Sequence, residues 1–219
     1  MVCHVGLCDP SVLNLNDTSS IQIERQIHKS NENVCSKGIF KSQPVVLKRA
    51  IISRPESIDN FEDEARILCL KELKNCVARP LAIVRAPPHY SIVLPYFENG
   101  SLVNVIQKHG AVNAQVAISL GIDICNALIA IHSSNLIHRD IKTANVLLTD
   151  KWKALLTDFG SAVLLNNDGE SVTEALPVKK VRTSHPSGGF HKQIIDGTTL
   201  GYTAPEILCN SSPAQAADI

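Results

Sequence analysis

The segment from Ile137 to Gly160 places several polar side chains among apolar residues. It begins Ile-His-Arg-Asp-Ile-Lys-Thr-Ala-Asn-Val-Leu-Leu at residues 137–148 and ends Leu-Leu-Thr-Asp-Phe-Gly at residues 155–160. The short β-type runs Val146–Leu148 and Ala154–Thr157 predict a small hairpin with a loop at each outer end. Both loops leave the same ribbon, so we expect Asn145 and Asp158 to point into one site.

These polar groups match the requirements of phosphoryl transfer. A carboxylate accepts the proton of an attacking hydroxyl, oxygen ligands hold Mg²⁺ against the phosphates, and a cation neutralises charge on the transferred group. Asp140 is our candidate base and Lys142 the cation, and Asn145 and Asp158 are the candidate metal ligands. For Asp-Phe-Gly alone, two hairpin loops with solvated charges would be the better interpretation. The joint motif, in this order and spacing, favours the catalytic one.

The complete set resembles the signature of the eukaryotic protein kinases. That signature has His-Arg-Asp, an Asn five residues after the Asp, then Asp-Phe-Gly and Ala-Pro-Glu. The chain has His138-Arg139-Asp140, Asn145, Asp158-Phe159-Gly160 and Ala204-Pro205-Glu206. The resemblance runs from about Ile23 to the C-terminus. It implies an α+β, bilobal kinase fold, with a small antiparallel β-sheet N-lobe that carries one helix and an incomplete helical C-lobe.

The resemblance also implies domain boundaries. Residues 1–20 form an N-terminal extension to which we assign no chemistry, and the N-lobe (21–94), the hinge (95–101) and a partial C-lobe (102–219) follow. The activation segment covers residues 158–206. Asp218 matches the aspartate that opens the central C-lobe helix, and the sequence stops there. We therefore expect a fragment or an incomplete gene product that leaves apolar C-lobe surface uncovered.

The N-lobe residues predict an ATP site. Val45–Lys48 is a compact strand that ends in a cation, and in kinases such a lysine binds the α- and β-phosphates of ATP. Phe61–Leu70 has the apolar spacing of an amphipathic helix, which Asp59 or Asn60 is placed to cap. The resemblance implies that one glutamate of this helix pairs with Lys48. Glu64 fits this role best and leaves Glu62 on the solvated face.

The phosphate-binding loop departs from the family pattern. If Val34 is the valine of Gly-x-Gly-x-x-Gly-x-Val, the glycine positions hold Ile27, Lys29 and Glu32. Without glycine, the backbone N–H groups cannot approach phosphate as closely. Val46 also replaces the alanine that precedes the strand lysine by two residues, and it should crowd the adenine face. These departures predict weak or unusual ATP binding. They keep open the alternative of a pseudokinase or scaffold, and a truncated, nonfunctional product is a third interpretation.

Two further predicted strands, Leu81–Val84 and Ser91–Leu94, lead to a segment that resembles the kinase hinge. Leu94 stands in the gatekeeper place. The resemblance implies that the Pro95 carbonyl and the Phe97 N–H bind adenine, and proline lacks only the N–H, so its carbonyl role survives. An ordinary strand-to-helix loop explains this segment equally well.

The C-lobe residues predict a long buried helix and a catalytic loop. Val112–His132 is apolar around most of its helical circumference, which places it inside a helical lobe. The resemblance implies that His138 packs against Phe159 and is structural. Arg139 is either a partner in a surface ion pair or a dock for a phosphorylated residue of the activation segment.

The activation segment and its surroundings predict the substrate class by resemblance. Lys142, two residues after the catalytic Asp, and Thr199, three residues before Tyr202, are similar to Ser/Thr kinases, and we favour the tyrosine-kinase-like branch. The implied cofactors are ATP and Mg²⁺. The implied partners are protein substrates and an upstream kinase. The candidate phosphate acceptors of the activation segment include Ser171, Thr173, Thr183, Ser184, Thr198 and Thr199. Several of them flank a basic, turn-rich insertion at residues 178–189.

Composition sets the remaining bounds. The 219 residues carry 21 basic and 21 acidic side chains, which gives no reason to expect a nucleic-acid partner. Seven scattered cysteines favour free thiols in a reducing compartment. The N-terminus lacks the pattern of a signal peptide, and we find no uninterrupted apolar run of the ~18–20 residues that a membrane span needs. We therefore expect an intracellular, cytoplasmic protein without a membrane span.

Overall fold

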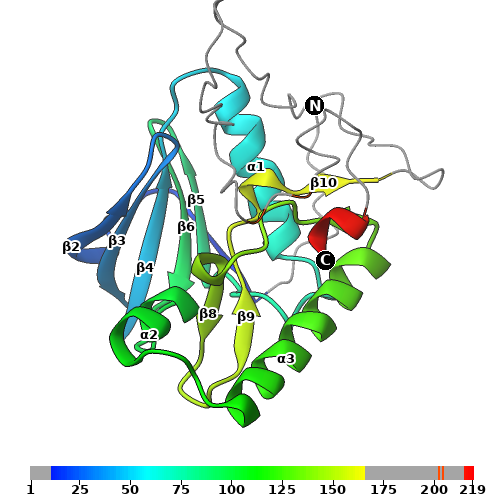
Figure 1. The fold of residues 1–219 in the computed structure, drawn as a ribbon. Coiled ribbons are helices and arrows are strands. Elements are labelled where there is room, and N and C mark those ends of the chain that lie inside the picture. Colours follow the sequence, from blue (N-terminus) through cyan, green and yellow to red (C-terminus); the bar gives the residue numbers. More distant parts are fainter. Residues whose placement is uncertain (1–10, 166–201, 203, 205–214) are drawn as a thin grey trace, which may run out of the picture.

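The structure is a computed structural model, and it describes residues 11–165, 202, 204 and 215–219. A six-stranded sheet carries helix α1 (Glu56–Leu68) on one face, and a second part holds helices α2 (Leu102–His109) and α3 (Ala114–Ser133) (Figure 1). The two parts form the α+β, two-lobed arrangement expected from the sequence.

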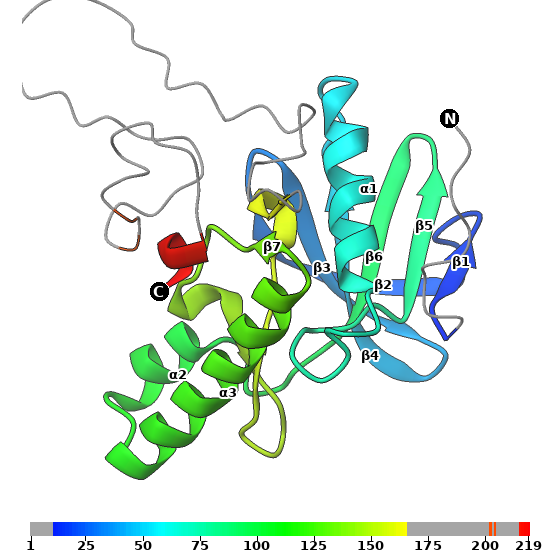
Figure 2. The same cartoon turned by 90° about the vertical axis from the view of Figure 1, so that its right-hand side faces the viewer.

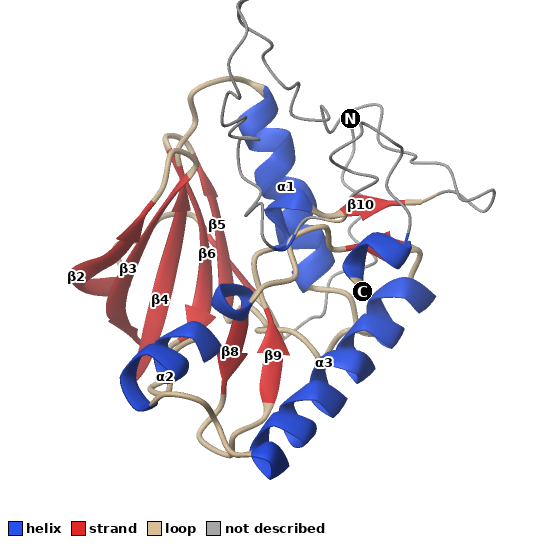
Figure 3. Cartoon of the chain, viewed as in Figure 1, coloured by secondary structure: helices blue, strands red, loops and turns tan. Residues whose placement is uncertain are grey.

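The strands fall into one large sheet and two small ones (Figure 3). The large sheet has the order β1-β5-β6-β4-β3-β2, and its pairs are antiparallel except for β1 and β5. Its strands are β1 (Leu13–Leu15), β2 (Ile21–Lys29), β3 (Asn33–Phe40), β4 (Gln43–Ala50), β5 (Ala82–Ala86) and β6 (His89–Pro95). The small sheets pair β7 (Leu136–Ile137) with β10 (Val163–Leu164), and β8 (Val146–Leu148) with β9 (Ala154–Leu156).

The large sheet is apolar on both faces. Ile92 and Leu94 belong to the main buried cluster together with Phe61 of α1, whereas Val45 and Val93 belong to a second cluster. Because side chains alternate along a strand, this split assigns the two clusters to opposite faces. Lys48 pairs with Ile92 in the register of β4 and β6, so it lies on the face that carries α1.

The N-terminal extension contributes a strand that the sequence analysis missed. The Leu13 N–H donates to the Leu81 carbonyl over 3.1 Å, and β1 runs parallel to β5 at the edge of the sheet (Figure 2). Val12 is buried in the same cluster as Phe61. Three residues in a polar stretch are too short for a periodicity signal, so only pairing with β5 defines this strand.

Helix α1 begins five residues before the predicted start. Pro55 occupies the N-cap position and no side chain caps the helix, so the prediction that Asp59 or Asn60 caps it is wrong. The proline already has a helical φ of −52°, and its ring favours that value. The apolar face was predicted correctly, since Phe61, Ala65 and Leu68 are buried.

Helix α3 packs along the β8–β9 hairpin, as Figure 1 shows. The Asn113 side chain caps it by accepting the Val116 N–H over 2.9 Å, and the Asp123 carboxylate accepts the Ala154 N–H over 2.9 Å. The prediction that this helix lies inside a lobe is not met on one of its sides in the described residues, in line with the expectation of uncovered apolar C-lobe surface. Ile118, Ile122 and Ile129 are 64%, 56% and 64% exposed, because no described element covers that side of the helix.

The length and composition of α3 would also allow it to cross a membrane. This is weak evidence for a span, because the core helix of a folded domain passes the same test. One side of α3 packs on the β8–β9 hairpin, and the isoleucines on its other side are exposed in the described residues.

Gly38 of β3 has a packing role. It pairs with Ile23 on β2, next to a register shift. A Cβ atom at this position would lie 2.5 Å from the Gln22 carbonyl oxygen, which is shorter than any normal contact. The close approach of β2 and β3 therefore requires glycine here.

We expect Gly38→Ala to destabilise the protein by about 1–3 kcal/mol, because backbone atoms of β2 must move to admit the methyl group. Gly121→Ala on α3 is the matched control. A Cβ there meets no atom within 4 Å, so the same change should stabilise by about 1 kcal/mol. Urea denaturation of both variants measures the difference, and a neutral Gly38→Ala would contradict it.

Candidate functional site

Lys48 is a buried cation that joins three parts of the chain. It lies on β4 and is 8% exposed. Its Nζ donates to Glu64 Oε1 on α1 over 2.5 Å and to Asp158 Oδ1 over 2.7 Å. Glu64, and not Glu62, therefore contacts the lysine. Asp158 precedes the Phe159–Ser161 turn of the second lobe, so a single ammonium group links the sheet, the helix and the Asp-Phe-Gly segment.

Electrostatics keep this cluster charged. Burial opposes charge on Lys48, but the carboxylates of Glu64 and Asp158 outweigh it and raise the pKa of Lys48. The Lys48 ammonium in turn lowers the pKa of Asp158 to about 2, against the effect of burial. Burial raises the pKa of Glu64, and the attraction of Lys48 opposes that rise. An ionised Asp158 beside a charged lysine is the state that phosphate or metal binding would use.

The loop after His138 holds three of the predicted catalytic side chains together. Lys142 Nζ donates to Asp140 Oδ2 over 2.7 Å. Asn145 Nδ2 donates to the same carboxylate oxygen over 2.8 Å and to the Asp140 carbonyl over 2.9 Å. These bonds fix the direction of the Asp140 carboxylate, and they leave the amide oxygen of Asn145 available to another ligand.

The β8–β9 hairpin brings Asn145 close to the Asp-Phe-Gly segment. Val146 pairs with Leu156 at the end of the ladder, and the Thr157 N–H donates to the Asn145 carbonyl over 3.1 Å. Asp158 comes next and takes a left-handed φ of 65°. The structure thus brings Asn145 and Asp158 to the same end of one ribbon, as the spacing predicted.

His138 is buried, and its bonds define its tautomer. Its ring packs on Phe159 with 4.6 Å between centroids, Nε2 lies 3.1 Å from the Thr157 carbonyl, and Nδ1 accepts the Asp140 N–H over 3.3 Å. A carbonyl only accepts, so Nε2 carries the proton and Nδ1 does not. Burial lowers the pKa of His138, which keeps the ring neutral. This arrangement is structural, as the sequence analysis expected.

Asp218 anchors the backbone of the catalytic loop from a distant part of the sequence. Its buried carboxylate accepts the His138 N–H over 2.8 Å and the Arg139 N–H over 2.7 Å. His132 Nε2 of α3 lies 3.0 Å from it. The family resemblance identified this aspartate but gave it no contact, because 80 residues separate it from His138.

Arg139 has a different partner from either of those considered. Its Nε donates to the Ser161 carbonyl over 2.5 Å, and its backbone has a left-handed φ of 65°. It therefore holds the Asp-Phe-Gly turn against the catalytic loop. The candidate phosphate acceptors that Arg139 was proposed to bind lie outside the described residues. The insertion at residues 178–189 lies outside them as well.

The strand register bears on which residues occupy the phosphate-loop positions. Cys35, and not Val34, pairs with Lys48 across β3 and β4, so Cys35 lies on the face of the strand lysine, and it fills the valine place if that place faces the lysine. The glycine places then hold His28, Ser30 and Asn33 around the β2–β3 turn. The turn still lacks glycine, but its residues differ from those first assigned. Sequence alone could not choose between neighbouring residues, because a shift of one residue exchanges the two faces.

Lys37 is a contact of the hinge that the sequence analysis missed. It pairs with Val46 on β4, on the Lys48 face of the sheet. Its Nζ lies 4.0 Å from the centre of the Tyr96 ring and 3.9 Å from Glu98 Oε1. Lys37 therefore ties the sheet to the segment that follows β6.

The hinge residues take positions that their predicted roles allow. The Tyr96 N–H donates to the Pro44 carbonyl over 3.1 Å. Because a trans peptide directs its N–H and C=O to opposite sides, the Pro95 carbonyl points away from β4. The Phe97 carbonyl accepts the Gly100 N–H over 2.9 Å, which closes a turn just before α2. No contact in the described residues tests whether Pro95 and Phe97 bind adenine.

The side chains at the Asn145–Asp158 end fit a magnesium ion that phosphates also coordinate. Among the described residues, no group of three or more His, Cys, Asp and Glu side chains could hold a metal. One carboxylate and one amide oxygen are the small protein contribution that Mg²⁺ accepts when phosphates and water complete its shell. Asn145 and Asp158 would therefore supply oxygen ligands of the kind that Mg²⁺ accepts.

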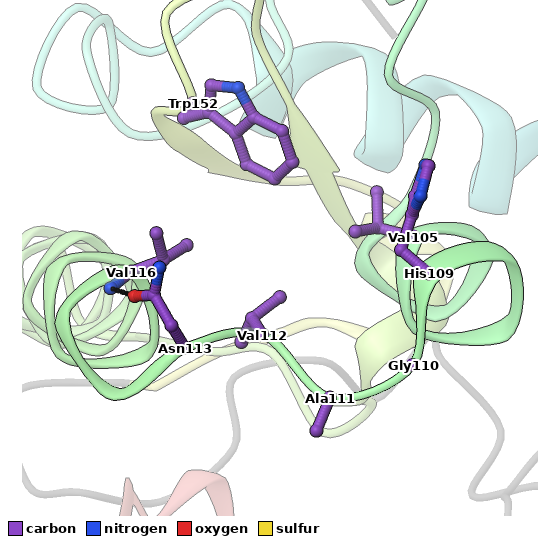
Figure 4. Close-up of a pocket in the computed structure, with 8 residues that line it drawn as sticks. All are labelled: Val105, His109, Gly110, Ala111, Val112, Asn113, Val116 and Trp152. Atoms are coloured by element: carbon purple, nitrogen blue, oxygen red, sulfur yellow. Dashed lines mark hydrogen bonds between the residues drawn. The ribbon is translucent and has the colours of Figure 1, made fainter.

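A separate hollow of about 330 Å³ lies away from this cluster. Figure 4 shows Trp152 of the β8–β9 turn facing the α2–α3 connection across it. The lining residues are Val105, His109, Gly110, Ala111, Val112, Asn113, Val116 and Trp152. None of them belongs to the predicted catalytic set, so the hollow takes no part in the site.

Comparison with known proteins identifies the family. A profile of the protein kinase domain matches residues 25–219, which include every residue of the cluster. The chain belongs to the protein kinase family. This kinase chain is 30% identical over 220 residues to a "Protein kinase and PP2C-like domain-containing protein" of Arabidopsis thaliana, covering 99% of the chain and 32% of the relative.

Other relatives carry Ser/Thr kinase names. A protein of the same description from Oryza sativa subsp. japonica is 29% identical, with 99% of the chain and 33% of the relative covered. "Serine/threonine-protein kinase STY17" of Arabidopsis thaliana is 28% identical, with 72% of the chain and 28% of the relative covered. The kinase chain thus spans about a third of these relatives' length. The names support a eukaryotic-like Ser/Thr kinase.

We expect stability to fall below pH 6.5 because of His138. Burial lowers its pKa from 6.5 in the fold, so the unfolded chain takes up a proton first as pH falls. The slope reaches about 1.4 kcal/mol per pH unit between the two pKa values. Urea denaturation from pH 7.5 to 5.5 should show a shallower slope for His138→Gln than for the wild-type chain, and His89→Gln, at an exposed site, is the control for the chemical change. Equal slopes for His138→Gln and wild type would exclude this contribution.

We expect Asp218→Asn to destabilise the kinase chain by about 2–3 kcal/mol. The amide would turn an NH₂ group toward a backbone N–H that the carboxylate now accepts, and it would leave that buried donor unpaired. Asp150→Asn, on the exposed hairpin turn, is the control and should lie within about 0.5 kcal/mol of wild type. Thermal and urea unfolding measure both variants. A silent Asp218→Asn would show that the loop is held by other contacts.

Proposed function

We propose that this kinase chain transfers the γ-phosphate of ATP to Ser or Thr hydroxyls of protein substrates. The observation that carries the proposal is the Lys48 bridge to Glu64 and Asp158, at 2.5 and 2.7 Å. The bridge joins the sheet lobe to the same hairpin end that presents Asn145. Bringing a buried ammonium and an ionised carboxylate together costs desolvation, and an anionic ligand with a metal ion supplies a reason to keep both.

Each side chain has a role in this reaction. The substrate hydroxyl approaches the other oxygen of the Asp140 carboxylate, which orients it and accepts its proton, because Lys142 and Asn145 already donate to Oδ2. Lys142 Nζ, now 2.7 Å from that oxygen, is close enough to neutralise charge on the transferred group. Lys48 exchanges Asp158 for phosphate oxygens and keeps Glu64 as its partner. Asn145 and Asp158 would hold Mg²⁺, and the ion would neutralise negative charge on the phosphates.

The adenine would lie between the sheet and the hinge. Its exocyclic amine would donate to the Pro95 carbonyl and its ring would accept the Phe97 N–H. Val46 and Leu94 pair across β4 and β6 and flank this space on the Lys48 face. The extra methyl groups of Val46, relative to alanine, narrow it.

We also propose the partners and location that follow from this function. Protein substrates and an upstream kinase that acts on the activation segment are the partners, with no nucleic acid and no membrane span. The free thiols of Cys35, Cys76 and Cys125 support a reducing, intracellular location, which we take as the cytoplasm.

We expect Asp140→Asn and Lys48→Ala to lower phosphate transfer about 100-fold or more, since each removes a group that acts on the reacting atoms. Transfer of γ-³²P from ATP to casein, with Mg²⁺, measures the rate. Asp150→Asn and Lys151→Ala make the same chemical changes at the exposed hairpin turn and should retain wild-type rates. Undiminished transfer by either site variant would reject the role of that residue.

A pseudokinase or scaffold is the second candidate, favoured by the glycine-free β2–β3 turn and by Val46. Such a protein would bind nucleotide or a partner without transferring phosphate. Thermal unfolding with and without MgATP separates the two functions. An MgATP-dependent rise in melting temperature without transfer to casein would support the pseudokinase, whereas transfer that Asp140→Asn abolishes would exclude it.

A further inference from the structure

Helix α1 touches the sheet through two residues that precede Glu64. Phe61 packs edge-on against Tyr90 of β6 with 5.4 Å between ring centroids. Glu62 binds Arg85 of β5. Arg85 and Tyr90 are direct partners in the β5–β6 register, so both lie on one face of the sheet. Arg85 and Tyr90 together form one contact surface for the middle of α1.

Arg85 also reaches the N-terminal strand. Its Nε lies 2.9 and 2.8 Å from the two Glu62 carboxylate oxygens, and its Nη1 donates to Asn14 Oδ1 over 2.6 Å. The guanidinium therefore connects β1 to α1 from its place on β5. Figure 2 shows the three elements in this order, with β5 between α1 and the edge strand.

The positions of the two glutamates on α1 link the Glu62–Arg85 contact to the placement of Glu64 in the site. Residues two apart on a helix point about 200° away from each other. Glu62 therefore points toward β5 on one side of α1, while Glu64 points toward Lys48 on the other. Rotation of α1 about its axis would withdraw Glu64 from Lys48. The contact of Glu62 with Arg85 opposes that rotation.

We propose that Arg85, held by Asn14 of strand β1, is a positioning residue that fixes α1 so that Glu64 reaches Lys48. Strand β1 of the N-terminal extension then helps to position Glu64 in the site through Arg85. The consequence for nucleotide binding rests on the proposed function, whereas the effect on α1 itself does not.

Partial exposure limits the size of the effect. The Arg85 and Glu62 side chains are 33% and 35% exposed, so solvent screens their attraction. Lys48 keeps Asp158 when Glu64 withdraws, which also moderates the loss. We expect Arg85→Gln to weaken MgATP affinity about three- to tenfold, and Asn14→Ala about two- to threefold.

The first test measures helix α1 directly, without nucleotide. Amide hydrogen exchange of residues 56–68 reports local opening of the helix. Arg85→Gln and Glu62→Gln should each accelerate it several-fold, and Asn14→Ala, at an exposed site, should do so more weakly. The charge-swapped pair Arg85→Glu with Glu62→Arg should recover part of the protection.

Arg66→Gln is the matched control. Arg66 pairs with Asp63 within α1 over 2.7 Å, so the variant removes an ion pair from the same helix without touching the sheet. Its exchange should stay close to wild type. If Arg85→Gln exchanges no faster than Arg66→Gln, the proposal is overturned.

The second test asks whether Arg85 acts through Glu64. MgATP affinity, from titration with a fluorescent ATP analogue, is compared for Arg85→Gln, Glu64→Gln and the double variant. A positioning role predicts that Arg85→Gln has little further effect once Glu64 is changed, whereas a general structural role gives additive losses. Additive losses would overturn the positioning role. If the wild-type chain binds no nucleotide, the proposed function fails, and hydrogen exchange still decides the role of Arg85.

Discussion

The buried ammonium of Lys48 is the interaction on which the arrangement of this kinase chain depends. A charge with so little access to water needs counter-charges, and the two that it has come from different elements. Glu64 comes from the helix on the sheet and Asp158 from the hairpin of the second lobe. Satisfying one cation therefore fixes the relative positions of a strand, a helix and the Asp-Phe-Gly turn.

In the catalytic loop the buried charge is negative, and it needs hydrogen-bond donors in place of carboxylates. The buried carboxylate of Asp218 needs donors, and it finds them in two backbone N–H groups and the His132 ring. His138 then stays neutral between the loop and Phe159, while Arg139 binds the Ser161 carbonyl. The polar groups that react are thus held by others that do not.

Local signals in the sequence were enough for much of this arrangement. The β8–β9 hairpin, the apolar face of α1 and the choice of Glu64 over Glu62 followed from periodicity and motif spacing. Errors came where the competing possibilities differ by one residue or by a partner. Val34 and Cys35 are neighbours, and only the pairing of β3 with β4 shows which one faces Lys48. Glu62 was placed in solvent because its partner, Arg85, lies 23 residues away.

The sequence by itself indicated the family and the residue types of the site, because these depend on the spacing of motif residues along one segment, and the resemblance to that family implied the two-lobed fold. Tertiary structure decided the strand that the N-terminal extension adds, the contacts of α1 with Arg85 and Tyr90, and the hydrogen bonds from the catalytic-loop backbone to Asp218. Each of these is a contact between residues distant in the chain. Such contacts leave no local pattern, since their free energy appears only when folding brings both partners together.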